Sequence, residues 1–402
     1  MRPFTSTITL DEARRRLDAA VRPIARIEQV PLEAAAARVA AADVVSPIDV
    51  PPFARSAMDG YAVVAADTTG ASKSAPARLR LVDRIYTAQM STTTITAGSC
   101  AEIATGAPLP AGADAVVMVE DTAQSGDGAI DVFTAAQPGQ NVGRRAADIA
   151  AGDSVIAAGD VLTPSRVGAI AAIGRTAVEV FARPRVAILS TGNEIVEPGR
   201  PLAPGHIYDV NRFTLAAIVE AHGGIPDPRR AVDDTVDALI ASLDACAGAD
   251  LMVFSGGSSV GERDLLVDAI AARGRMVFHG IAVRPGKPTA FATVDGAPFF
   301  GMPGNPTSCL SNAYILLVPF LRALARLPPY TPRTLRVPLG RRIASAVNRH
   351  QFYTVTVRDG VAMPAFKGSG DITSLSRADG YIEIPADQSV VEEGSLVTVT
   401  LF

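Results

Sequence analysis

The sequence predicts a multidomain α/β protein whose largest domain is a doubly wound sheet with helices on both faces. Three observations predict this fold class. The chain has 402 residues, more than one hydrophobic core ordinarily holds. From Arg185 onward, short apolar runs typical of buried strands alternate with helical patterns. On either side of this region, strand-like patterns begin after Val44 and again after Tyr330.

The first part of the chain predicts a small helical domain that is interrupted by a β-rich insertion. Apolar residues have helical spacing over residues 9–21 and 32–42, and helical character returns near 165–173. Between about Val44 and Asp148 glycine and proline become frequent, and residues 115–119 look like a strand. We therefore expect a discontinuous N-terminal domain at 1–45 and 146–180, and a β-rich insertion domain at 46–145.

The central region, residues 181–328, predicts a parallel sheet flanked by helices. Strands are expected at 186–189, 251–254 and 276–283, and helices at 211–222, 235–245, 264–273 and 307–327. In such sheets ligands bind outside the carboxyl ends of the strands, so the loops that follow these strands should converge. Beyond the proline-rich residues 328–332, alternating patterns at 353–357 and 396–400 predict a β-barrel-like C-terminal domain at 329–402.

The composition excludes several classes of protein. Hydrophobic residues make up 48% of the chain and charged residues 19%, which excludes a mainly disordered protein. No apolar run approaches the roughly 20 residues that span a bilayer and the first residues lack a signal-peptide pattern, so the cytoplasm is the expected location. The net charge of -4 and the absence of a basic, aromatic run argue against nucleic-acid binding. The cysteines and histidines are scattered without metal-ligand spacing.

Two loops combine glycine and proline with basic or amide side chains. Arg284 and Lys287 flank the first, and the second, residues 301–308, contains Asn305 followed by Pro306. This pair predicts the N-cap and first residue of a helix. Glycines let backbone N–H groups approach a ligand, and the two cations supply positive charge, so both loops favour an anion.

Residues 255–264 form a glycine-serine loop that opens a predicted helix. Backbone donors and a helix N-terminus can hold a phosphate or another oxyanion. The loop is not a Walker loop, because Gly-Lys-Ser/Thr is missing. A tight strand-to-helix turn without a ligand explains the same glycines equally well, and Glu262 and Asp264 are then ordinary helix-start acids.

Carboxylates and amides also stand at other predicted strand ends. Glu194 follows the first central strand, and Asp209 and Asn211 precede the next helix, where capping alone explains them. Asp233 and Asp234 start the following helix. Capping is the favoured explanation for this pair, and a site for a hard cation is the alternative.

Two further acids lie in the predicted insertion and at its end. Asp59 precedes Gly60 between extended segments, and a structural Asp-Gly turn with aromatic packing explains it without a ligand. Asp148 stands near Arg144 and Arg145, where a solvated loop is the simpler interpretation.

Taken together, these segments resemble the molybdopterin molybdenumtransferase family of molybdenum cofactor biosynthesis, which includes the E domain of gephyrin. The match runs nearly end to end. It is carried by Ser56-Ala57-Met58-Asp59-Gly60-Tyr61-Ala62-Val63, Thr191-Gly192-Asn193-Glu194, Ile207-Tyr208-Asp209-Val210-Asn211, Ser255-Gly256-Gly257-Ser258-Ser259-Val260-Gly261, Pro285-Gly286-Lys287-Pro288 and Pro303-Gly304-Asn305-Pro306. The resemblance implies a four-domain homodimer whose central domain binds molybdopterin. The insertion domain of the partner subunit would complete each active site.

The reaction that the resemblance implies is insertion of molybdenum from molybdate into adenylylated molybdopterin, with Mg²⁺-assisted cleavage of the adenylate and release of AMP. The implied catalytic residues are Asp59, Asp148, Glu194, Asp264 and Lys287, and the implied metal ligands are Glu194, Asp233, Asp234 and Asp264. The implied substrate contacts are Ser56, Thr191, Gly192, Asp209, Asn211, Ser255, Gly256, Gly257, Ser259, Gly261, Arg284, Pro303, Gly304, Asn305, Pro306 and Ser369. A molybdopterin adenylyltransferase upstream and molybdoenzymes downstream are the implied partners.

The chain departs from the family pattern at four positions near this chemistry. Arg284 stands where a lysine is usual, Ala147 and Asn193 replace acids, and Arg55 replaces an asparagine. An arginine fork does not replace a lysine point charge in every geometry. A non-catalytic molybdopterin-binding or scaffold paralogue on the same fold is therefore the alternative hypothesis. Most of the polar site residues are retained, which favours the enzyme.

Overall fold

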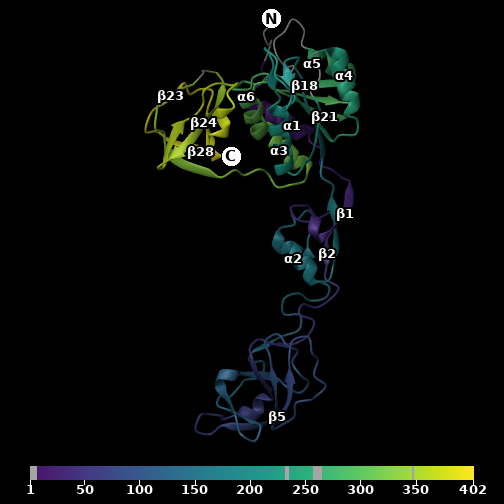
Figure 1. Ribbon diagram of the computed structural model, residues 1–402, viewed down its shortest axis with the longest axis vertical. Coiled ribbons are helices and arrows are strands. Elements are labelled where there is room, and N and C mark those ends of the chain that lie inside the picture. Colours follow the sequence, from purple (N-terminus) through teal and green to yellow (C-terminus); the bar gives the residue numbers. More distant parts are fainter. Residues whose placement is uncertain (1–6, 231–234, 257–264, 346–347) are drawn as a thin grey trace. The chain divides into compact units, whose positions relative to one another are not determined.

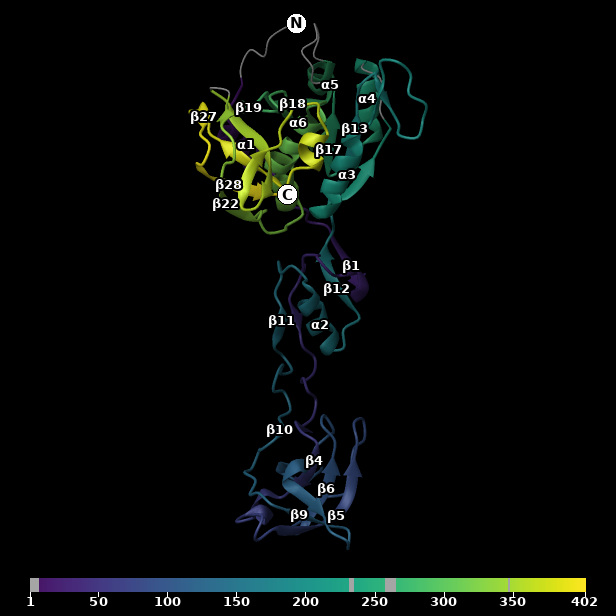
Figure 2. The same cartoon turned by 60° about the vertical axis from the view of Figure 1, so that its left-hand side comes forward.

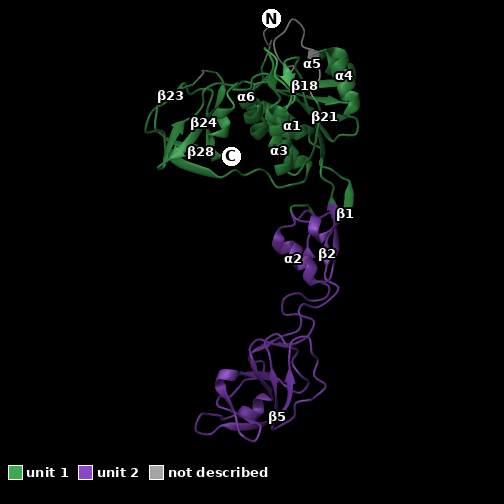
Figure 3. Ribbon diagram, in the orientation of Figure 1, with its two compact units in different colours: residues 1–28, 37–39, 181–402 green, residues 29–36, 40–180 purple. Residues whose placement is uncertain are grey.

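The computed structural model describes residues 7–230, 235–256, 265–345 and 348–402. The chain divides into two compact units (Figure 3). Unit 1 comprises residues 1–28, 37–39 and 181–402, and unit 2 comprises residues 29–36 and 40–180.

Unit 1 contains a six-stranded sheet with the order β16-β13-β17-β21-β20-β18. The strands are β13 (Arg185–Ser190), β16 (Ile225–Pro228), β17 (Leu251–Ser255), β18 (Gly274–His279), β20 (Ala290–Val294) and β21 (Ala297–Met302). The four strands from β16 to β21 run parallel, as predicted, whereas β20 is antiparallel to both of its neighbours. The reason is the two-residue turn Asp295-Gly296, in which both residues have positive φ, so β20 and β21 form a hairpin.

Helices cover both faces of this sheet (Figure 1). On one face α1 (Leu10–Ala20) and α3 (Asn211–Ala221) pack with Val186 and Ile188 of β13. On the other face α4 (Val236–Ala245) and α5 (Leu265–Arg273) pack with Ala187 and Leu189. Successive residues of β13 therefore enter opposite cores, which explains why this strand is an uninterrupted apolar run. The doubly wound fold predicted from the sequence is confirmed.

The predicted helix at 307–327 is divided into three parts in the structure. α6 (Pro306–Asn312) is followed by a π-helical turn (Ala313–Leu317) and by α7 (Val318–Leu324). Pro319 has no N–H, so the regular bond to the carbonyl four residues earlier cannot form, and the wider turn precedes it. Residues 306–324 are long and apolar enough to cross a membrane, which corrects the prediction that no run qualifies. Because 72% of this segment is buried, it forms a core helix of unit 1.

A second sheet in unit 1 has the order β19-β24-β26-β28-β22, with β25 paired to β24 (Figure 2). The strands are β19 (Val283–Arg284), β22 (Thr334–Pro338), β24 (His350–Arg358), β25 (Val361–Pro364), β26 (Gly380–Ile384) and β28 (Leu396–Leu401). The strands predicted at 353–357 and 396–400 lie within β24 and β28. The strand predicted at 276–283 is wrong at its end, because β18 stops at His279 and Val283 pairs with β24 instead.

Unit 2 contains a small core built from residues on both sides of the insertion. Val30 and Ala40 pack there with Ile156, Ile170 and Val180. The elements around it are β1 (Ile27–Pro31), β2 (Val44–Val45), β11 (Ser154–Ile156), α2 (Pro164–Ala172) and β12 (Ala177–Phe181). The helix α2 confirms the prediction at 165–173.

The helix predicted at 32–42 is wrong, because only the short 3₁₀ turn Leu32–Ala34 forms. Ala37 has a φ of 62°, which no α-helix contains. The N–H groups of Ala40 and Ala41 donate instead to the carbonyls of Asp160 and Glu179. This alanine-rich stretch has few large side chains with which to stabilise a helix, and these distant partners determine its conformation.

The insertion in unit 2 is a six-stranded sheet with the order β7-β4-β6-β5-β9-β8. Its strands are β4 (Gly60–Val63), β5 (Ala77–Ile85), β6 (Ser99–Ile103), β7 (Ala115–Met118), β8 (Thr122–Gln124) and β9 (Ala129–Val132). β3 (Arg55–Ser56) pairs separately with β10 (Val142–Gly143). Because this sheet, the small core and the two sheets of unit 1 each contain their own hydrophobic cluster, we propose the four-domain division with the boundaries predicted above.

Candidate active site

Three parallel strands of unit 1 end side by side, and the loops that follow them are in contact. Ser190 of β13 lies opposite Ser255 of β17, which lies opposite Met302 of β21. The N–H of Thr191 donates to the carbonyl of Ser255 at 2.8 Å, and the N–H of Gly256 donates to the carbonyl of Met302 at 3.2 Å. The predicted convergence of strand-end loops is therefore present between these three strands.

Gly256 allows the closest of these approaches. Its φ is +100°, and a Cβ at this position would lie 2.2 Å from the carbonyl oxygen of Thr191. Real Cβ contacts are never that short, so any larger residue would separate the two loops. The glycine is needed for this packing whether or not a ligand binds.

Asn211 joins the start of α3 to two of the strand ends. Its Nδ2 donates to Ser255 Oγ at 2.7 Å and to the carbonyl of Gly304 at 2.7 Å. Its Oδ1 and the Oγ1 of Thr191 are both buried, and neither has a hydrogen-bond partner among the described residues. Buried polar atoms are rarely left unpaired, so these two atoms are candidates to bind a polar ligand.

Asp209 has a different role from that of Asn211. Its Oδ1 accepts hydrogen bonds from Ser190 Oγ at 2.8 Å and from the N–H of Arg212 at 3.1 Å, in the first turn of α3. The Nε of Arg212 lies 3.5 Å from Asp209 Oδ2, and both side chains are nearly buried. Arg212 also contacts Glu197 at 3.2 Å. Asp209 Oδ1 therefore binds a first-turn N–H of α3, while its Oδ2 is buried with no hydrogen-bond partner among the described residues.

Asn305 contacts the C-terminal region rather than its own helix. It is the N-cap residue of α6 and Pro306 follows at the first position, as predicted. However, its side chain makes no capping bond, and its Nδ2 donates to Ser369 Oγ at 3.1 Å. The N–H of Thr307 donates to the carbonyl of Ser369 at 3.1 Å. Ser369 thus lies beside the loop of Pro303 and Gly304.

The loop with the two cations lies near the opposite end of α6. Arg284 is exposed in β19 and Lys287 is partly buried. Gly286, with a φ of 101°, contacts Asn312, the last residue of α6. Seven helical residues span about 10 Å, so the two ends of α6 lie within reach of one extended substrate.

Asp59 is an exposed carboxylate in unit 2 that Thr105 holds in place. The N–H and the hydroxyl of Thr105 donate to Asp59 Oδ1 at 2.7 and 2.9 Å. These bonds, the backbone bond first, lower the pKa of Asp59. Ser56 is buried and accepts a hydrogen bond from the N–H of Met58 at 3.3 Å, which shapes the turn before Asp59.

The sequence does not identify Thr105 as a partner of Asp59, because 46 residues separate the two. The available signal was a hydroxyl residue next to Gly106 just after an apolar strand. Asp148 is exposed, and its N–H donates to the carbonyl of Val50 at 3.0 Å.

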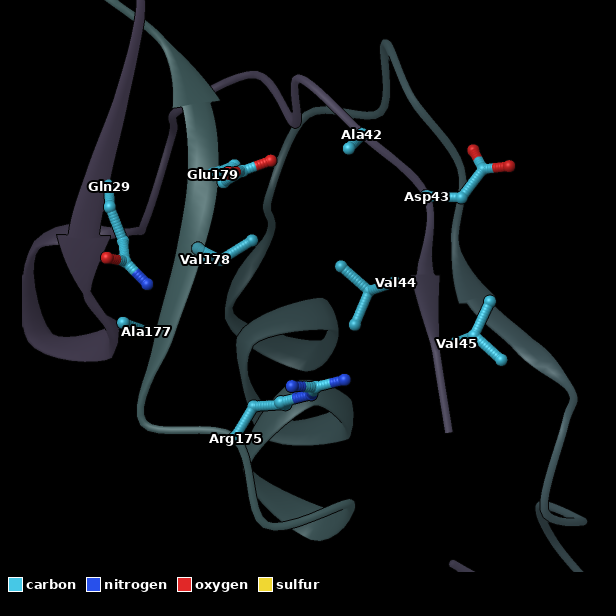
Figure 4. Close-up of a pocket in the computed structure, with 9 residues that line it drawn as sticks. All are labelled: Gln29, Ala42, Asp43, Val44, Val45, Arg175, Ala177, Val178 and Glu179. Atoms are coloured by element: carbon cyan, nitrogen blue, oxygen red, sulfur yellow. The ribbon is translucent and has the colours of Figure 1, made fainter. Parts of the chain in front are cut away.

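Pocket volume does not identify the site. A pocket of about 250 Å³ in unit 2 lies between β12 and β2, lined by Gln29, Ala42, Asp43, Val44, Val45, Arg175, Ala177, Val178 and Glu179 (Figure 4). It contains none of the predicted site residues. A smaller pocket of about 180 Å³ includes Asp59, Tyr61, Tyr86, Glu102 and Val119. We therefore identify the site by its chemistry.

The structure describes only part of the predicted metal site. Of its four carboxylates, Glu194 is exposed, and its Oε2 would lie 2.8 Å from a Cβ at Gly192. Asp233, Asp234 and Asp264 lie outside the described residues, as do Gly257, Ser259 and Gly261. Within the described ranges no group of three His, Cys, Asp or Glu side chains is placed to hold a metal ion. These residues alone do not make a complete Mg²⁺ site.

Three family models match consecutive parts of the chain. Residues 8–174 match the MoeA N-terminal region (domain I and II), and residues 187–323 match a probable molybdopterin binding domain. Residues 336–402 match the MoeA C-terminal region (domain IV). The matches follow one another in the order that the resemblance implies.

Similar proteins match over nearly the whole length. The chain is 37% identical to molybdopterin molybdenumtransferase 2 of Mycobacterium tuberculosis, over 94% of this chain and 95% of that protein. It is 32% identical to the molybdopterin molybdenumtransferase of Haemophilus influenzae, over 98% of both. A solved MoeA structure from Pyrococcus horikoshii has 38% identity and a TM-score of 0.85, covering 98% of this chain and 99% of that one. The chain therefore belongs to the molybdopterin molybdenumtransferase family and is an enzyme of molybdenum cofactor biosynthesis.

Proposed function

We propose that this enzyme inserts molybdenum from molybdate into adenylylated molybdopterin and releases AMP. The observation that carries the proposal is the strand-end site, where Thr191 Oγ1 and Asn211 Oδ1 are buried without described partners. A pterin ring presents N–H donors and a carbonyl acceptor at its edge. The amide oxygen accepts from such donors, and the threonine hydroxyl can donate or accept. Both atoms therefore suit a pterin edge.

We propose that the cationic loop holds the anionic part of the substrates. Lys287 supplies a point charge and Arg284 a planar fork, both suited to molybdate or to the adenylate phosphate. Ser369 and Asn305 add hydroxyl and amide groups at the other end of α6. A substrate that carries a pterin, a phosphate and an oxyanion has one group for each of these regions.

We propose that Asp59 acts at the active site of the partner subunit in a homodimer. Both donors of Thr105 bind Oδ1 of Asp59, so Thr105 does not engage Oδ2. The lowered pKa keeps this carboxylate ionised, which suits a group that stabilises positive charge. Asp148 is a second exposed acid of unit 2, and we propose it for the same site.

Mg²⁺ is the proposed cofactor, because an adenylate linkage needs its negative charge offset during cleavage. Glu194 and the three acids beyond the described residues are its proposed ligands. Chelation should stop AMP release, and added Mg²⁺ should restore it. Undiminished release in excess chelator would remove Mg²⁺ from the proposal. We also propose a cytoplasmic location between a molybdopterin adenylyltransferase and the molybdoenzymes.

The decisive assay measures AMP release and molybdenum incorporation by the purified protein. Adenylylated molybdopterin and Mg²⁺ are supplied with and without molybdate. Molybdate-dependent AMP release together with active cofactor is the expected result. Tight pterin binding without AMP release would refute the proposed reaction. Arg284, Ala147, Asn193 and Arg55 would then be the first residues to replace with those that are usual in the family.

Subunit mixing tests whether the site is shared between protomers. Asp59→Ala and Lys287→Ala should each be inactive alone. In a mixed dimer, one site combines the intact Lys287 of one subunit with the intact Asp59 of the other. Random mixing should therefore restore about a quarter of the wild-type activity. No recovery, with mixed dimers verified by differential tagging, would place both residues of a site in one subunit.

A further inference from the structure

Asn312, the last residue of α6, is a fully buried polar side chain. Burying an amide costs free energy unless it is hydrogen-bonded, so its contacts are informative. Its Nδ2 donates to the carbonyl of Gly286 at 2.8 Å and also to Thr289 Oγ1. A carbonyl can only accept, and this determines which side of the amide faces Gly286.

Thr289 shares these contacts, whereas the Oδ1 of Asn312 is buried with no hydrogen-bond partner among the described residues. Thr289 is fully buried, and its hydroxyl donates to the carbonyl of Gly286 at 3.0 Å while it accepts from Asn312. A Cβ on Gly286 would lie 2.2 Å from Asn312 Nδ2, and the φ of Gly286 is +101°. Gly286, Thr289 and Asn312 are called the Gly286 clamp below.

The clamp holds the loop that contains Arg284 and Lys287. Lys287 directly follows Gly286, and its carbonyl accepts from the N–H of Ile281 at 2.9 Å. The loop leaves the central sheet after β18, adds β19 to the second sheet and returns to β20. Both ends of the loop are therefore fixed by β18 and β20 of the central sheet, and its middle is held by the pairing of β19 with β24 and by the clamp.

We propose that Asn312 and Thr289 are positioning residues that fix Lys287 for molybdate binding. Neither side chain is exposed, so both act through the backbone of Gly286. The inference rests on the role proposed above for Lys287. A displacement of about 1 Å at a reacting group can cost up to about 100-fold in rate. Loss of the clamp should therefore raise the half-saturating concentration of molybdate more than that of adenylylated molybdopterin.

The test compares Asn312→Ala and Thr289→Val with Thr289→Ser, which keeps the hydroxyl. We expect the first two to raise the half-saturating molybdate concentration roughly tenfold or more, with the value for adenylylated molybdopterin changing less than about twofold. Thr289→Ser should behave like wild type. The double variant should be no worse than the worse single variant, because both break the same contacts. Ser311→Ala, which alters the neighbouring buried residue of α6, is the matched control.

A second readout does not depend on activity. Hydrogen exchange at the N–H of Ile281 should become faster in Asn312→Ala and Thr289→Val, but not in Ser311→Ala. The positioning role is wrong if both variants keep the wild-type half-saturating molybdate concentration. It is also wrong if they raise the half-saturating concentrations of both substrates equally. Lys287→Ala distinguishes failure of the positioning role from failure of the proposed function. If Lys287→Ala leaves the half-saturating molybdate concentration unchanged, the role of Lys287 itself is wrong.

Discussion

Gly256→Ala should impair catalysis far more than its effect on stability would suggest. The new Cβ would lie 2.2 Å from the carbonyl oxygen of Thr191, whereas real contacts begin at about 3.0 Å. The loops after β13 and β17 must therefore separate by about 1 Å. A shift of that size at a substrate site can reduce the rate by up to about 100-fold. The φ of +100° adds about 1–3 kcal/mol of backbone strain.

Gly248→Ala is the matched control for the backbone strain alone. Gly248 has a φ of +83°, and a Cβ there would meet no atom within 4 Å. We expect both variants to lower the free energy of unfolding by a similar 1–3 kcal/mol from strain. Only Gly256→Ala should lower kcat/KM, by roughly 10- to 100-fold.

The assay is AMP release with both substrates varied, alongside thermal unfolding of each variant. Wild-type kcat/KM in a folded Gly256→Ala protein would show that contact between the two loops is not required for catalysis. An equal loss of kcat/KM in Gly248→Ala would assign the effect to strain rather than to the close approach.

Three further changes test other contacts. Thr105→Val removes the hydroxyl bond that helps to lower the pKa of Asp59, so this pKa should rise towards its ordinary value and the acid limb of the kcat/KM profile should move to higher pH; an unmoved limb would show that Asp59 does not titrate in the reaction. Asp209→Ala removes one of the two carboxylates that contact the buried Arg212 and leaves only Glu197, so it should lower the free energy of unfolding by about 1–3 kcal/mol in urea titration, and no measurable change would contradict the contribution of the buried pair. Ser369→Ala removes one neutral hydrogen bond, so a stability loss of about 1 kcal/mol is expected with a lower kcat/KM, and an unchanged kcat/KM would make Ser369 purely structural.

The sequence by itself determined the elements whose signal is local. Helical patterns of apolar residues predicted α1, α2, α3 and α4, and continuous apolar runs predicted β13 and β17. The alternation of strands and helices also predicted that the loops after the parallel strands converge at one edge of the sheet. The family motifs could be recognised because they are short, contiguous and arranged in order. Each of these signals lies within a few residues of the structure that it predicts.

Only the tertiary structure determined which partner each polar side chain contacts. Asp209 and Asn211 are equivalent as a sequence pattern, yet one caps α3 and the other bonds to two strand ends. Thr105 meets Asp59 across 46 residues, and Asn305 meets Ser369 across 64. The expected helix at 32–42 failed for a related reason, since distant carbonyls bind its N–H groups. These hydrogen-bond partners are determined by packing between segments far apart in the chain. Periodicity is a local signal and cannot predict them.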